Sequence, residues 1–127
     1  MLSLIHLYWA FGGKAGRAEA VPSAGGHPAF EPSTSATLMV AAALAAAMLV
    51  ILGAIGWFGD AIAPVPYAWM TLVIALLFLL RAIGDFRRVG FFKQVSDSSF
   101  AYWDTRLYSP LCVVVTVLAF AILWLRP

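Results

Sequence analysis

Charged residues are scarce in this chain of 127 residues: Asp, Glu, Lys and Arg together make up 11%, against about 25% in a typical soluble domain. A chain with so few charges cannot cover a water-exposed surface, so its 63% hydrophobic content indicates a protein of the lipid bilayer. This composition also excludes intrinsic disorder, which requires low hydrophobicity and high net charge. The single cysteine, Cys112, excludes a disulfide framework, a CxxC redox pair and a cysteine zinc site. The net charge of +2 argues against a nucleic-acid surface.

Long uncharged runs predict the fold. A membrane-spanning helix needs about 20 mostly apolar residues, and neither residues 36–58 nor residues 61–80 contain a charge. We predict an all-α integral membrane bundle of four helices, at residues 1–11, 36–58, 64–86 and 107–125, with cytoplasmic loops at 12–35 and 87–106. The first helix is short, and a stub that ends in mid-bilayer would leave unpaired backbone donors in lipid. The stub is either a half-span packed in a notch of the bundle or a truncated helix, and we expect the second, with Met1 assigned too late as the start.

The distribution of Lys and Arg predicts the orientation, because these residues are enriched in cytoplasmic loops. Arg126 follows the last predicted helix, and the other cations fall in the two larger loops or at their edges: Lys14, Arg17, Arg81, Arg87, Arg88, Lys93 and Arg106. The short loop at 59–65 contains Asp60 and no cation. This pattern predicts a multi-pass membrane protein with both larger loops in the cytoplasm and its C-terminus outside.

The segment RAIGDFRR, at residues 81–88, is the most unusual feature, because it follows directly on an apolar run. Spacings of three and four residues would place Arg81, Asp85 and Arg88 on one helix face. Charges close to hydrocarbon are costly, and they usually face the bundle interior and pair with each other. Two interpretations remain open: a helix end with snorkelling arginines and a paired Asp85, or a polar pocket at the cytoplasmic leaflet.

His6 adds a candidate proton carrier at the same membrane depth. Its position, about 9 Å inside the boundary at Gly12, would let it meet Asp85 or Arg81, and a carboxylate would raise its proton affinity. We predict His6 and Asp85 as candidate catalytic residues. The candidate ligand-binding residues are Tyr8, Arg81, Arg88, Asp104, Arg106 and Tyr108. Asp104 with Thr105, or Ser109, could alternatively only cap the last helix, with Pro110 in its first turn.

No metal site is predicted, because His6 and His27 lack a third ligand at a suitable spacing and zinc takes three or four protein ligands. Haem ligation by two histidines is likewise unsupported, and the identity of any cofactor stays open.

Three motifs resemble a known family: HLYWAFGG at 6–13, RAIGDFRRVGFFK at 81–93 and DTRLYSPL at 104–111. Together they are similar to small bacterial integral membrane proteins catalogued as domain of unknown function 3995. The resemblance implies four helices in the bacterial inner membrane, with a full first helix ahead of the first motif. It implies no activity.

Three functions are compatible with the sequence. The first is binding of a small amphipathic or lipid-like molecule in a polar pocket at the cytoplasmic leaflet, with or without acid–base chemistry, which leaves enzyme activity open. The second is an accessory or structural subunit of a larger membrane complex. The third, ranked lowest because the chain has no pair of broken helices, is a small channel or transporter that would need a homo-oligomer. The lipid bilayer is a partner in each case, and nucleic acid in none.

Overall fold

The computed structural model describes residues 1–24, 26–59 and 66–125, and most of these residues are helical. The elements in chain order are α1 (Leu2–Ala10), α2 (Arg17–Ala20), β1 (Ser23–Ala24), β2 (His27–Pro28), α3 (Thr34–Ala54), α4 (Tyr67–Ile83), α5 (Ser99–Trp103), a π-helical turn η2 (Asp104–Tyr108) and α6 (Ser109–Leu125). The two strands form a small antiparallel hairpin, in which Ser23 faces Pro28. The predicted loop at 60–65, with Asp60, and the C-terminal Arg126 lie outside the described residues.

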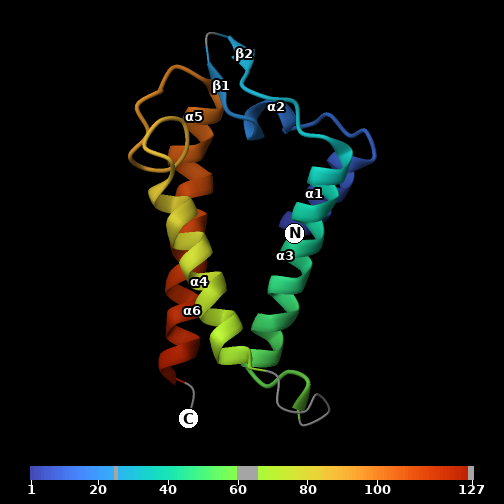
Figure 1. Cartoon of the computed structure of the whole chain (residues 1–127), viewed down its shortest axis with the longest axis vertical. Helices are drawn as coiled ribbons and strands as arrows, with labels where there is room; N and C mark the ends of the chain where they lie inside the picture. The colour runs from blue at the N-terminus through green and yellow to red at the C-terminus, as the bar shows by residue number, and fades with distance from the viewer. Residues whose placement is uncertain (25, 60–65, 126–127) are drawn as a thin grey trace.

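The helices form two pairs (Figure 1). Helix α1 packs along α3, and α4 packs along α6. The pairs meet where α3 leads towards α4, and α2 contacts α5 at the opposite end. Small buried residues let the helices approach closely: Ala75 of α4 accepts a hydrogen bond from Thr116 of α6 (3.4 Å), and Ala41 of α3 accepts one from Ser3 of α1 (2.8 Å).

Both central helices end earlier than predicted. Helix α3 begins at Thr34, where the Ser33 hydroxyl accepts a hydrogen bond from the amide of Ala36, and it ends at Ala54 rather than at residue 58. Helix α4 ends at Ile83 rather than at residue 86, because Gly84 adopts a φ of +86° that no helix can continue through. Asp85 therefore does not lie on the helix that carries Arg81.

The last helix begins earlier than predicted, so the predicted loop at 87–106 is too long. Residues 99–106 are helical, and the Ser98 hydroxyl caps their start by accepting a hydrogen bond from the amide of Ala101 (3.0 Å). Pro110 consequently lies inside a continuous helical segment and not in a first turn. Because proline has no N–H to donate to a preceding turn, the helix widens here, and the amide of Ser109 bonds the carbonyl of Asp104, five residues back.

Two helices in the described part of the chain, Thr34–Ala54 and Ser99–Leu125, are long and apolar enough to span a membrane. Helix α4 is also apolar but has 17 residues, a length of about 25 Å at 1.5 Å per residue. Only 17% and 22% of the most apolar windows of the two longer helices are buried inside the fold. Most of their apolar side chains therefore point away from the other helices.

Candidate functional site

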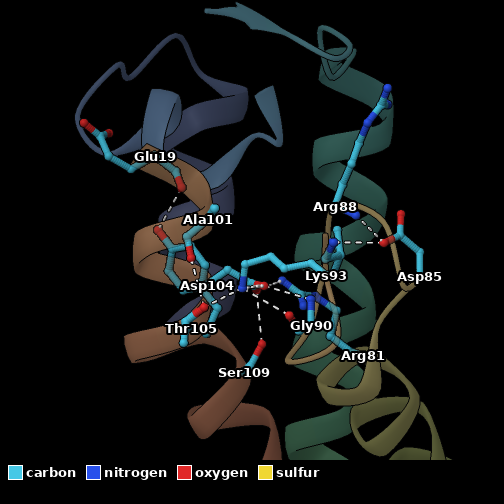
Figure 2. Close-up of polar contacts among 12 residues, drawn as sticks. Glu19, Arg81, Asp85, Arg88, Gly90, Lys93, Ala101, Asp104, Thr105 and Ser109 are labelled. Carbon is cyan, nitrogen blue, oxygen red and sulfur yellow. Dashed lines mark hydrogen bonds and ion pairs between the residues drawn. The ribbon is translucent and has the colours of Figure 1, made fainter. Parts of the chain in front are cut away.

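The Asp104 carboxylate is the centre of the polar site, and Asp104 is fully buried. Its Oδ1 atom accepts hydrogen bonds from Nη2 of Arg81 (2.8 Å) and from the hydroxyl of Ser109 (3.3 Å). Its Oδ2 atom accepts hydrogen bonds from the amide of Gly90 (2.8 Å) and from Nζ of Lys93 (3.1 Å). Figure 2 shows these donors converging on one carboxylate. We call these five residues the Asp104 site.

Local backbone geometry brings the donors together. The π-helical turn places Ser109 above Asp104, since its wider winding aligns residues five apart rather than four. On the other side, residues 84–91 fold back on the end of α4, where the amide of Phe91 bonds the carbonyl of Ala82 (2.9 Å). A side chain at Gly90 would overlap the carbonyl of Ile83, so only glycine allows this close approach.

The site carries more positive than negative charge. The side chain of Lys93 is 6% exposed and also donates to the carbonyl of Gly90 (3.1 Å) and to the hydroxyl of Thr105. The side chain of Arg81 is 35% exposed, but its Nη1 atom is buried and has no hydrogen-bond partner among the described residues. Two cations thus share one carboxylate, and a buried donor of Arg81 can still serve an acceptor. This arrangement suits an anionic oxygen atom.

Asp85 closes a turn instead of joining this site. Its Oδ1 atom accepts hydrogen bonds from the amides of Arg87 (3.0 Å), Arg88 (2.7 Å) and Val89 (2.9 Å). The bonds from the amides of Arg88 and then Arg87 hold the pKa of Asp85 below its ordinary value. Asp85 is exposed and lies away from Asp104 in Figure 2. The predicted ion pair with Arg81 is therefore replaced by the pair between Arg81 and Asp104, because the helix ends before Asp85.

His6 is held within its own helix. Its Nδ1 atom donates to the carbonyl of Leu2 (2.8 Å), and its ring packs edge-on against Trp9, with 5.1 Å between centroids. In the described residues no hydrogen bond or ion pair joins His6 to Asp85, so the structure does not assemble the candidate catalytic pair. Tyr8, on the same helix, is half exposed and lies against Gly13.

The remaining predicted ligand-binding residues point to other partners. The guanidinium of Arg106 stacks over the ring of Tyr102 at 4.7 Å. The hydroxyl of Tyr108 donates to the carbonyl of Glu19 (3.3 Å), which ties η2 to α2. Arg88 meets Asp85 only through its backbone amide. Of the predicted site residues, the structure joins Arg81 to Asp104 through their side chains and Asp85 to Arg88 through the backbone amide of Arg88.

Sequence reasoning missed three members of the site: Gly90, Lys93 and Ser109. A signal for Lys93 was present, since a carboxylate next to an apolar helix needs cationic partners and Lys93 stands in the same motif as Arg81. Among the described residues, no three of His, Cys, Asp or Glu gather as metal ligands.

An apolar groove of about 460 Å³ lies between α3 and α4. It is lined by apolar side chains within residues 40–50 of α3 and 70–78 of α4. Leu77 and Phe78 line its end nearest the Asp104 site, and Arg81 follows them by one helical turn on α4. The apolar lining therefore ends one helical turn before the cationic side chain of Arg81 on α4.

Comparison with known proteins gives one result. A family profile described as "Protein of unknown function (DUF3995)" matches residues 1–119, a stretch that includes the groove and the whole Asp104 site. Neither the curated proteins nor the solved structures that were compared contain a match. Because the profile covers nearly the entire sequence, the chain belongs to the DUF3995 family.

Proposed function

We propose that this protein is an integral membrane protein that binds a small amphipathic, lipid-like molecule. The apolar tail occupies the groove between α3 and α4, and the anionic head meets the cations of the Asp104 site. The observation that carries this proposal is the apolar groove ending one helical turn from Arg81.

Residence in a membrane is supported by the outward-facing apolar surfaces of the two long helices. The cationic residues of α2, η2 and the end of α4 gather at one end of the molecule, and α6 ends at Leu125 at the other (Figure 1). We propose residence in the bacterial inner membrane. The enrichment of Lys and Arg in cytoplasmic segments then favours an orientation with the Asp104 site at the cytoplasmic leaflet and the C-terminus outside.

The chemistry of the ligand follows from charge and volume. An anionic head balances the second cation of the Asp104 site and can accept a hydrogen bond from the buried Nη1 atom of Arg81. The groove volume falls within the usual range for small-molecule sites, about 300–1,000 Å³. We propose binding rather than catalysis, because His6 and Asp85 each form their hydrogen bonds within their own segment.

An accessory role in a larger complex is the second candidate, and one observation favours it. Ala43, Ala46 and Ala47 line the α3 side of the groove, and small residues of this kind also admit the backbone of a partner helix. A stable partner chain seated in the groove would exclude the lipid-like ligand.

Native mass spectrometry of the detergent-purified protein with added palmitate tests the proposal. Ala42 and Ala43 are both exposed neighbours on α3, but only Ala43 lines the groove. We expect Ala43→Trp to abolish palmitate binding and Ala42→Trp to leave it intact. Hexadecanol has the same tail without the charge. It should bind at least about tenfold more weakly than palmitate, because it lacks a charge-assisted hydrogen bond. Equal binding of palmitate by both Trp variants would contradict the proposal.

A further inference from the structure

We propose that residues 84–92, which we call the 84–92 loop, anchor the protein to lipid headgroups. In this anchor, Phe86 and Phe92 insert among the headgroups at the end of α4, and Arg87 and Arg88 bind the phosphates of anionic lipids. The inference rests on the membrane residence proposed above, but it is independent of any ligand in the groove.

Aromatic exposure is the first observation. Phe86 is 58% exposed and Phe92 is 63% exposed, and their rings lie 6.0 Å apart between centroids. Phe91, the neighbour of Phe92 in the sequence, is also exposed. Contiguous exposed apolar side chains mark a surface that meets another molecule or a membrane.

The backbone holds Phe86 in this exposed position at an energetic cost. Its φ is +59°, in the left-handed region that bulky residues rarely adopt. Such a conformation persists only where the surroundings enforce it. Three amide bonds to Asp85 and the close approach of Gly84 to Val89 and Gly90 enforce it here. The loop is therefore a turn of defined conformation that keeps an aromatic ring exposed.

Charge identifies what the loop meets. The side chain of Arg87 is exposed and that of Arg88 is half-exposed, and within the described residues neither forms an ion pair. Among the described residues the carboxylate of Asp85 forms no ion pair with them, because its hydrogen bonds go to the backbone amides that follow it. Two available guanidinium groups beside aromatic rings complement a surface of anionic phosphates, since arginine binds phosphate with two parallel hydrogen bonds.

The expected depth of the 84–92 loop in the membrane agrees with lipid headgroups as its partner. Helix α4 is about 25 Å long, close to the hydrocarbon thickness of about 30 Å. Tyr67 and Trp69 stand at the other end of α4, where aromatic residues mark a membrane boundary. The 84–92 loop therefore falls at the level of the headgroups on the opposite side.

Electron paramagnetic resonance of nitroxide labels in vesicles measures this depth. Phe86→Cys carries the probe in full-length protein reconstituted in phosphatidylcholine with or without phosphatidylglycerol. Cys112 is buried, and the labelled wild type gives the background. Val117→Cys, at an exposed apolar position of α6, and Ser96→Cys, at an exposed polar position, are the controls. Collisions with oxygen report lipid, and collisions with a water-soluble nickel chelate report water.

We expect the label at 86 to be protected from the nickel chelate relative to that at 96, and more strongly protected when phosphatidylglycerol is present. The double change Arg87→Gln with Arg88→Gln should abolish the effect of phosphatidylglycerol. Equal nickel access at 86 and 96 would overturn the proposal. So would inorganic phosphate reproducing the effect of phosphatidylglycerol, because the site would then bind free phosphate. Failure of the label at 117 to report lipid would instead overturn the membrane residence itself.

Discussion

Replacing Asp104 by Asn removes the negative charge that holds Arg81 and Lys93 together, while keeping the shape of the side chain. Breaking a buried ion pair by removing one partner costs about 3–5 kcal/mol, because the other charge stays buried and unpaired. Lys93, whose side chain is 6% exposed, accounts for most of this cost. The contribution of Arg81 is smaller, because its side chain is 35% exposed and water screens the charge.

Thermal unfolding in detergent measures the effect. A loss of about 3 kcal/mol corresponds to a fall of roughly 10 °C in the midpoint for a chain of this size. The double variant Asp104→Asn with Lys93→Met removes the stranded cation and should recover most of the loss. Ser109→Ala is the matched control, since it deletes only a hydroxyl donor at 3.3 Å and should cost about 1 kcal/mol. An unchanged midpoint for Asp104→Asn, or no recovery in the double variant, would refute the reasoning.

Three further predictions concern the neighbouring backbone. Gly90→Ala should lower the free energy of unfolding by about 3 kcal/mol, because it displaces the amide that bonds Asp104. Gly56→Ala, at a similar φ but in open space, should lower it by about 1 kcal/mol, and thermal unfolding measures both. Phe86→Gly should leave the midpoint unchanged or slightly raised, because relief of about 1–2 kcal/mol of left-handed strain offsets the entropy cost of glycine, about 0.5–1 kcal/mol; a lower midpoint would contradict this. Since amide bonds, that from Arg88 foremost, lower the pKa of Asp85, its turn should be fully formed above the ordinary carboxyl pKa of about 3.9 and lost as the pH falls through the lowered value. A lower protection factor for the Arg88 amide in acid, calculated against its intrinsic exchange rate at the same pH, would show this, and Asp85→Asn should remove the pH dependence of that factor.

The approximate places of the helices could be predicted from the sequence, because uncharged runs of sufficient length leave few alternatives. The helix ends could not. The end of α4 depends on the φ of Gly84, and an isolated glycine in a helical pattern is also compatible with a continuing helix. The start of the last helix was missed because Pro110 is typical of a first turn, while the fold accommodates it with a π-helical turn.

The residues of the site were predicted in part for a related reason. The charged residues of the second and third motifs were predicted to lie at one level of the bundle, and Arg81 and Asp104 do meet. Helical spacing paired Arg81 with Asp85 because those residues are near in sequence. The actual pairing is set by the fold-back of residues 84–91, which turns Asp85 outwards and delivers Gly90 and Lys93 to Asp104. Such a fold-back leaves no periodic pattern in the sequence.

Photo-cross-linking in membranes tests the proposed ligand site most directly. A fatty acid with a diazirine near the end of its chain is added to vesicles that contain the protein, and the cross-linked residues are mapped by mass spectrometry after irradiation. The account predicts cross-links concentrated in residues 40–50 of α3 and 70–78 of α4, which line the groove. Cross-links spread evenly over the exposed residues of α6, such as Val114, Val117 and Leu118, would show ordinary contact with bilayer lipid and would contradict it.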